Sequence, residues 1–455
     1  MAPGGYREVI ILAWPLFLSM GSTTILQFID RMFLAWFSPE AIAAAGPSGM
    51  LAFAFQSFFI GMVGYASVFV AQYTGAQQPR KAVAVVWQAL YLSIIAALLL
   101  LLMLPLGAQV FQLAGHAAAI QQLERSFFTV LMLGSFTGIG SSALSAYFIG
   151  RGQTRVILFV NVIGMVINII AAYLLVFGNF GCPRLGIVGA ALSTVLAQIV
   201  GLVIFFVIFL RESREAHGGD AWHFEFTMMK RLLRFGTANG VQFSLDMIGW
   251  TIFLLLVGRL GVAALAASNI AFMVNTFAYF PCIGFGMATS TLVGQNMGRK
   301  NPGQANYAVW SAIHISLLFT ALIGVLFLTI PGWIISPFSA QADPAAFAPV
   351  RDLTIVMLRF VAAYCLFDVG NLVFTAALKG AGDIFYVTLI STSNMLVTLL
   401  LPTFLICRNP MHGGNDIYTV WIILTLSVTV ASAFFLLRYL KGHWQEMQVI
   451  EEAVI

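Results

Sequence analysis

The sequence predicts an all-α integral membrane protein with twelve transmembrane helices, in two six-helix lobes related by a pseudo-twofold axis along the membrane normal. Three observations lead to this fold class. Of the 455 residues, 60% are hydrophobic and only 9% are charged, which is untypical of a soluble domain. Twelve apolar stretches are long enough to cross a bilayer. The second half of the chain also repeats features of the first.

The apolar stretches predict the helices. A membrane span needs roughly 20 mostly apolar residues, and a backbone in lipid must satisfy its own hydrogen bonds, as a helix does. The second and eighth stretches are long, which allows tilt or an extension into water. The twelve predicted spans are 9–37, 47–73, 83–104, 126–149, 156–178, 185–210, 232–258, 264–295, 306–335, 353–378, 385–407 and 417–440.

The Lys and Arg residues predict the orientation. With both termini in the cytoplasm, fifteen of them fall at cytoplasmic positions and five at outer positions. Positive residues are enriched in cytoplasmic loops. We therefore predict a multi-pass protein whose N- and C-termini are both cytoplasmic.

An internal repeat divides the chain. Residues 60–87, shifted by 223 positions, match nine later residues, among them Gly61 with Gly284 and Trp87 with Trp310. Each half has an even number of spans, so both enter the membrane from the same side, and the axis relating them runs along the membrane normal. The longest polar segment separates the halves. The predicted domains are an N-lobe (1–215), a cytoplasmic linker (216–231) and a C-lobe (232–455).

Polar residues form a stripe on the span at 353–378. Tyr364, Asp368, Asn371 and Thr375 are spaced by 4, 3 and 4 positions, so they share one helical face. Lipid would penalise such a face, which we therefore expect in the protein interior. Hard cations prefer oxygen ligands, and the stripe predicts a cation or proton site.

Similar spacings occur on three other spans. The span at 232–258 carries Gln242 and Asp246, and the first span carries Gln27 and Asp30. The fifth span carries Asn161 and Asn168, seven residues apart on nearly one face.

Hydrogen bonds from single amides and hydroxyls are routine between packed membrane helices, so for these residues we weigh that interpretation over a functional one by about two to one. The carboxylates are different, because a charge at the membrane centre costs at least ~2.5–3.5 kcal/mol and packing alone rarely justifies it. Asp30, Asp246 and Asp368 are therefore the strongest candidates for function.

The sequence gives little support to enzyme chemistry. The six His residues have no metal-ligand spacing, and the chain lacks the glycine-rich phosphate loop that would bind ATP. We predict that the protein is not an enzyme, has no cofactor beyond a coupling ion, and does not bind nucleic acid.

The chain resembles the multidrug and toxic compound extrusion (MATE) family, and within it the NorM-like branch. The resemblance covers nearly the whole sequence and rests on six segments: FIDRMFLAWFSPEAIAAAG (28–46), AQYTGAQQPRKA (71–82), ALSAYFIGRGQTR (143–155), VGRLGVAALAASNIA (257–271), ATSTLVGQNMGRKN (288–301) and FTAALKGAGD (374–383).

The resemblance implies roles for residues that match the family pattern. Asp30 matches the N-lobe acid, whose protonation or cation binding is proposed to reshape the first helix. Asp246 matches an acidic position on the seventh helix. Asp368, with Tyr364, matches the C-lobe cation site of the NorM-like branch, so a Na⁺ ion is expected at Asp246, Tyr364 and Asp368. Asn161 and Asn168 match a helix that supplies amides to the N-lobe site.

Two departures make the N-lobe less negative than the family pattern. Ala172 stands where an acid often follows the second Asn, and Arg31 stands where a small residue or Thr is common. We therefore expect coupling to depend mainly on the C-lobe. Gln27, Asn161, Asn168, Gln242, Asn371 and Thr375 are expected to line the substrate cavity.

The resulting functional hypothesis is a monomeric secondary antiporter of the bacterial inner membrane. It would export amphipathic or cationic organic compounds, as in multidrug efflux, in exchange for Na⁺ or H⁺ by alternating access. The sequence leaves the choice of ion open. The alternatives are a lipid-linked oligosaccharide flippase of the same superfamily and a dedicated metabolite exporter. A channel or a membrane-embedded enzyme would belong to a different class.

Overall fold

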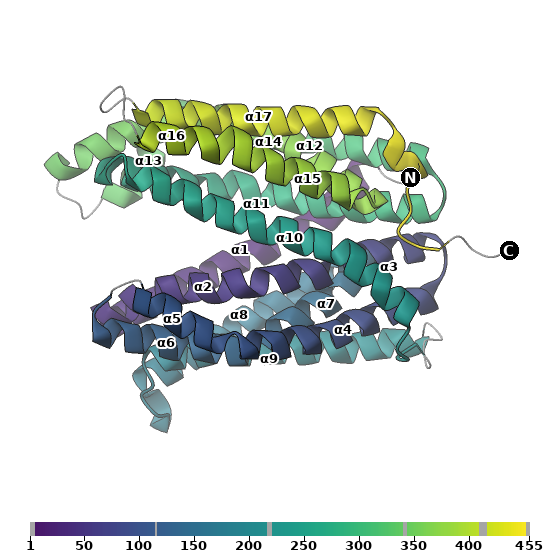
Figure 1. Ribbon diagram of the computed structural model, residues 1–455, viewed down its shortest axis with the longest axis horizontal. Helices are drawn as coiled ribbons and strands as arrows, with labels where there is room; N and C mark the ends of the chain where they lie inside the picture. The colour runs from purple at the N-terminus through teal and green to yellow at the C-terminus, as the bar shows by residue number, and fades with distance from the viewer. Residues whose placement is uncertain (1–4, 114–115, 216–220, 340–343, 409–415, 452–455) are drawn as a thin grey trace. The chain divides into compact units, whose positions relative to one another are not determined.

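The computed structural model describes residues 5–113, 116–215, 221–339, 344–408 and 416–451, and the regular elements in these ranges are helices (Figure 1). The chain divides into two compact units. Unit 1 comprises Met1–Trp14 and Leu245–Gln448, and unit 2 comprises Pro15–Ser244 and Val449–Ile455. The lobe and linker boundaries expected from the sequence stay a prediction, and the structure is described here unit by unit.

Unit 2 holds most of the first half of the chain. Its helices are α1 (Tyr6–Phe37) from Pro15 onwards, α2 (Pro39–Gly64), α3 (Ala66–Gly75), α4 (Pro79–Leu102), α5 (Leu104–Leu113), α6 (Ala118–Leu133), α7 (Ser135–Arg151), α8 (Thr154–Phe177), α9 (Ile187–Glu215) and the part of α10 (Phe226–Gly258) up to Ser244, with a short 3₁₀ turn η1 (Asn179–Gly181).

Unit 1 holds most of the second half, and its helix α14 packs along both α11 and α17 (Figure 1). Its elements are the first turns of α1, the remainder of α10, α11 (Val262–Gly298), α12 (Pro302–Thr329), α13 (Pro331–Ser339), α14 (Pro344–Ala381), α15 (Ile384–Asn394), the π-helical turn η2 (Met395–Leu400), α16 (Leu401–Arg408), α17 (Asp416–Leu440) and η4 (His443–Glu446).

The number of spans confirms the predicted fold class. Within the described ranges, eleven helical segments are long and apolar enough to cross a membrane, and the bent pair α6 and α7 makes a twelfth. The pair meets at an angle of 42°. Gly134 lies at this bend, and a Cβ atom there would collide with the Val195 side chain of α9. The close approach of α9 is therefore compatible with glycine and not with a larger residue.

The internal repeat is visible in the backbone. Gln77 and Lys300, which are 223 positions apart, both adopt left-handed conformations, with φ of 57° and 56°. Each is followed two residues later by the proline that begins the next helix, Pro79 for α4 and Pro302 for α12. Proline is favoured in the first turn because its missing N–H has no helical partner there. The two halves therefore build the same turn with the same chemistry.

A second repeated feature is a close contact between helices. A Cβ atom on Gly150 of α7 would come within 2.5 Å of the Ser67 carbonyl oxygen on α3. A Cβ atom on Gly380 of α14 would come equally close to the Ser290 carbonyl oxygen on α11. Ser67 and Ser290 are again 223 positions apart. In each unit a glycine thus permits backbone-to-backbone packing, as is common between membrane helices.

Two helices contribute to both units. Helix α1 changes unit between Trp14 and Pro15, and α10 changes unit between Ser244 and Leu245. Pro15 lies inside α1, and a proline there removes one backbone hydrogen bond and clashes with the preceding turn. The first turns of α1 pack within unit 1, where the Tyr6 hydroxyl is 2.9 Å from His314 Nδ1.

Candidate functional site

Asp30 lies on α1 beside a buried amide of α8. In one of its two amide orientations, Asn168 has a hydrogen-bond partner for both its nitrogen and its oxygen. Its Nδ2 then donates to Asp30 Oδ1 at 2.9 Å, and its oxygen accepts from the Thr194 backbone N–H of α9 at 3.2 Å. The Asn168 side chain is completely buried, whereas Asp30 is half-buried. The hydrogen-bonding groups of a buried amide are expected to have partners, and here the Asn168 nitrogen has the Asp30 carboxylate as its partner.

The other predicted residues of unit 2 lie apart from this contact. Asn161 donates to Ser19 Oγ at 2.5 Å and so joins α8 to α1 nearer the start of α1. Gln27 has an exposed side chain. Gln242, on the part of α10 that belongs to unit 2, is 5% exposed. The structure therefore brings together Asp30 with Asn168 and gives Asn161 a different partner.

The stripe on α14 forms the second candidate site, in unit 1. Asn371 donates from Nδ2 to Asp368 Oδ1 at 3.1 Å. Tyr364 is only 4% exposed, and its hydroxyl has no hydrogen-bond partner among the described residues. The Thr375 hydroxyl is in the same situation. A buried hydroxyl without a partner is costly, so each of these two oxygens is available for one further hydrogen bond or ligand.

Helix α11 adds polar residues that the sequence analysis missed. Cys365 of α14 donates from Sγ to Asn275 Oδ1 at 3.1 Å. Tyr279 follows Asn275 by one helical turn and interacts electrostatically with both Asp368 and Asp246. The spacing of four between Asn275 and Tyr279 is the same signal that identified the α14 stripe, and it could have identified this face as well.

Asp246 lies on the part of α10 that belongs to unit 1, and its side chain is exposed. Besides Tyr279, it interacts electrostatically with Lys379, which is half-buried near the end of α14. Lys379 stands eleven residues after Asp368, which is close to three helical turns and places both on one face. Asp246 therefore has a basic side chain in its surroundings, whereas Asp368 lies about three turns further along the same face of α14.

The donor set of unit 1 consists of oxygens that a hard cation would accept. It offers the Asp368 carboxylate, the Asn371 amide oxygen and the unpartnered Tyr364 hydroxyl, and hard cations favour such oxygen ligands. Within the described residues, no group of three or more His, Cys, Asp and Glu side chains could hold a metal ion. Such an oxygen donor set suits a hard cation better than a transition metal, which prefers nitrogen and sulfur ligands.

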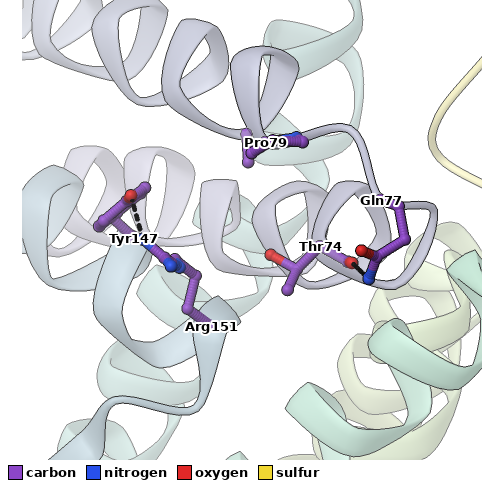
Figure 2. A pocket seen from close by; sticks show the side chains of 6 residues that line it. Thr74, Gln77, Pro79, Tyr147 and Arg151 are labelled. Carbon is purple, nitrogen blue, oxygen red and sulfur yellow. Dashed lines mark hydrogen bonds between the residues drawn. The ribbon is translucent and has the colours of Figure 1, made fainter. Parts of the chain in front are cut away.

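A small cavity of about 220 Å³ lies elsewhere in unit 2 and contains none of these residues (Figure 2). Arg151 donates to the Tyr147 hydroxyl at 2.5 Å and forms an ion pair with Glu212 at 2.6 Å. Its charge is therefore already compensated, and we assign no ligand to this cavity. It is lined by Thr74, Gln77, Pro79, Ala82, Tyr147 and Arg151.

Comparisons with known proteins identify relatives along the whole chain. A sequence model of the MatE family matches residues 15–174 and 240–404. A probable multidrug resistance protein NorM of Thermotoga maritima is 24% identical over 453 residues, covering 98% of this chain and 94% of the relative. The multidrug resistance protein NorM of Burkholderia vietnamiensis is 28% identical over 380 residues, covering 82% and 80%.

Solved structures share the fold. An outward-facing multidrug resistance MATE family transporter of the MOP superfamily superimposes with a TM-score of 0.86 at 19% identity, covering 97% of both chains. A MOP superfamily transporter from Pyrococcus furiosus gives a TM-score of 0.85, also at 19% identity and with 97% of both chains covered. At this level of identity the likeness concerns the fold alone.

Proposed function

The chain belongs to the MatE family, and on this premise we propose that it is a secondary antiporter. It exports amphipathic or cationic organic compounds in exchange for Na⁺ or H⁺, and it works by alternating access. The proposed location is the bacterial inner membrane, with both termini in the cytoplasm and a monomeric protein in the bilayer. Its named relatives are multidrug resistance proteins, which supports organic compounds as the cargo.

One observation carries the proposal. Asp368 accepts a hydrogen bond from Asn371, and the buried Tyr364 hydroxyl on the same face of α14 has no partner among the described residues. An acid inside a membrane span marks an ion or substrate pathway by default. Asp368 can hold a cation or a proton, while Tyr364 and Asn371 supply neutral oxygens beside it.

Transport of the organic compound and of the ion is coupled if both bind to the same acids. A cationic organic compound and a coupling cation compete for the same carboxylates, because one negative charge cannot compensate two separate positive charges in a low-dielectric site. Occupation by one therefore excludes the other. Tyr279 interacts with both Asp246 and Asp368, which makes these two acids the proposed pair, and Asp30 with Asn168 forms a second ion-responsive site in unit 2.

The experiment is ethidium transport in proteoliposomes under an imposed Na⁺ or H⁺ gradient. The test variant is Asp368→Asn, and the control is Asp352→Asn, which removes an exposed acid from the first turns of the same helix. We expect one of the gradients to drive ethidium movement in wild type and in the control, and the test variant to lose it. The gradient that works identifies the ion.

Absence of ethidium movement in folded wild-type protein under both gradients would refute the multidrug antiporter. The hypotheses to test would then be a lipid-linked oligosaccharide flippase and a dedicated metabolite exporter. Equal transport by wild type and Asp368→Asn would instead remove Asp368 from the coupling site.

A further inference from the structure

The chain between α9 and α10 carries three aromatic residues at alternate positions, and all three are exposed. Trp222, Phe224 and Phe226 are 52%, 59% and 71% exposed, and all belong to unit 2. Large apolar side chains grouped on a surface mark a site of interaction with a protein or a membrane. We name residues 222–234, which comprise this stretch and the first turns of α10, the α9–α10 segment.

Polar side chains of α4 hold the backbone of the α9–α10 segment. Gln88 donates from Nε2 to the His223 carbonyl oxygen at 2.9 Å, and its Oε1 accepts from the Glu225 N–H at 3.4 Å. The Tyr91 hydroxyl donates to the Trp222 carbonyl oxygen. Gln88 is completely buried, and both ends of its amide are bonded to this segment. The segment is therefore attached to α4 through its backbone, while its aromatic side chains stay exposed.

The attachment lies where the exposed apolar face of α4 begins. Residues 82–93 are buried or half-buried. Within one helical turn of Tyr91, Ile94 and Ile95 are 47% and 49% exposed, and Leu98 further on is 59% exposed. Because α4 is long and apolar enough to cross a membrane, we expect these exposed side chains to face lipid. The α9–α10 segment therefore lies at the edge of the hydrocarbon region, where Trp and Tyr are enriched in membrane proteins.

The first turns of α10 have a buried face and an exposed face. Met228 and Leu232 are 3% and 0% exposed. Phe226, Lys230 and Arg234 follow one another at intervals of four residues, which places them on one face of the helix, and all three are exposed. A helix face that combines an aromatic ring with cations suits a membrane surface with anionic headgroups.

The charges of the α9–α10 segment also favour an anionic partner. Its three basic residues outnumber its one acid, Glu225. Arg231 lies 3.2 Å from Glu451, whose carboxylate also pairs with Lys81 at 3.4 Å. The other two basic residues lie on the exposed face of α10 described above.

We propose that the α9–α10 segment is an interfacial membrane anchor. Trp222, Phe224 and Phe226 insert among the lipid headgroups of one leaflet, and Lys230 and Arg234 bind anionic headgroups there. This leaflet is the cytoplasmic one in the orientation proposed above. The anchor does not depend on which compound or ion is transported, because it is built entirely from contacts within unit 2.

The test measures the depth of a nitroxide label in full-length protein reconstituted into vesicles. The label is attached at Thr227→Cys, an exposed position beside Phe226. The background carries Cys182→Ser, because the other three cysteines are buried. Leu98→Cys on α4 provides the lipid reference, and Arg155→Cys at the exposed start of α8 provides the water reference. Collisions of the label with oxygen, which concentrates in lipid, are compared with collisions with a water-soluble nickel complex.

We expect the ratio of oxygen to nickel collisions at Thr227→Cys to lie between those of the two references. Trp222→Ser combined with Phe226→Ser should raise the nickel collisions at this label by roughly twofold or more. Trp36→Ser is the matched control and should leave the ratio as in wild type, because Trp36 is 65% exposed in the same unit but lies outside the segment. A ratio in otherwise wild-type protein equal to that of Arg155→Cys would overturn the anchor.

The role of the two cations is tested by changing the lipid. Vesicles of phosphatidylcholine alone are compared with vesicles that also contain phosphatidylglycerol. The label at Thr227→Cys should lie deeper in the anionic vesicles, and Lys230→Gln combined with Arg234→Gln should remove this difference. Arg155→Gln is the control and should retain it. Equal depth in both kinds of vesicle would overturn the binding of anionic headgroups.

A second copy of the chain is the competing occupant of this surface. Two copies that meet there would bring two labels together and broaden the spectrum of Thr227→Cys. Dilution with unlabelled protein before reconstitution would then sharpen the spectrum, and this result would overturn the anchor. A spectrum that does not change on dilution supports lipid as the occupant.

Discussion

Asp30 Oδ1 lies 2.9 Å from Asn168 Nδ2, so a hydrogen bond joins α1 to α8 within unit 2. The amide is held in turn by the Thr194 backbone of α9. Two hydrogen bonds through the Asn168 amide thus link α1, α8 and α9. A change in the charge of Asp30 alters the strength of this link, because hydrogen bonds to ionised acceptors are roughly twice as strong as neutral ones.

The first prediction concerns this link. Asn168→Ala removes the donor and leaves the acid without it, which should lower the free energy of unfolding by about 1–3 kcal/mol. In a double-mutant cycle with Asp30→Asn, the two effects should not add, because the residues are in contact. Thermal unfolding in detergent measures this. Asn161→Ala with Asp30→Asn is the control and should be additive within about 0.5 kcal/mol.

The second prediction concerns the Tyr364 hydroxyl. Tyr364→Phe keeps the ring and removes an oxygen that has no partner among the described residues, so the thermal stability of the ion-free protein should stay the same or rise. If Na⁺ is the coupling ion, its apparent affinity should fall roughly tenfold for the loss of one ligand worth about 1.4 kcal/mol.

Sodium dependence of transport is the measurement for Tyr364→Phe, and Tyr307→Phe, at an exposed position on α12, is its control. A lower stability of Tyr364→Phe without any change in ion dependence would show that the hydroxyl has a structural role only.

The third prediction concerns the close helix contacts. Gly150→Ala and Gly380→Ala each push a methyl group against a serine carbonyl oxygen of a neighbouring helix. Such overpacking typically costs about 1–3 kcal/mol, and both variants should unfold at lower temperature. Gly46→Ala on α2 is the control, since nothing lies within 4 Å of its added Cβ atom. Equal melting temperatures for all three variants would contradict the close packing.

The fourth prediction concerns the ion pair between α17 and the turn after α14. Arg438 donates from Nε to Asp383 Oδ2 at 2.7 Å, and the two side chains are only 18% and 6% exposed. Asp383→Asn leaves the arginine buried without its counter-charge, which should destabilise the protein by about 3 kcal/mol.

The control for Asp383→Asn is Glu215→Gln, which breaks a pair with Arg211 whose side chains are 72% and 84% exposed. Exposed helical pairs contribute little, so this variant should unfold like wild type. Thermal unfolding of both variants side by side decides the point.

Much of the fold was predictable from the sequence for a simple reason. In lipid each span must be a helix, and length and apolar composition reveal it. The bend between α6 and α7 was not predictable, because it depends on how closely Val195 of α9 approaches Gly134. Helices α1 and α10 each belong partly to one unit and partly to the other. This division also depends on packing between helices, which the apolar pattern of the sequence does not reveal.

The candidate sites were predictable where the partners share one helix. The spacing from Tyr364 to Thr375 placed a polar stripe on α14, and the structure shows Asn371 bonded to Asp368. Partners on other helices were missed, because helix periodicity does not specify which helices adjoin. One example is Thr194, whose backbone N–H bonds to Asn168. Another is Tyr279, which interacts electrostatically with Asp368 and Asp246. The functional roles of all these residues stay predictions.

The docking of Glu451 on Lys81 and Arg231 has a consequence for biogenesis. The ribosome makes Lys81 and Arg231 long before Glu451. Most of unit 2 is therefore synthesised before the carboxylate that pairs with these two cations. Its assembly is completed only after the helices of unit 1 have been inserted. A nascent chain that stalls within unit 1 therefore lacks the carboxylate that pairs with Lys81 and Arg231 in the finished protein.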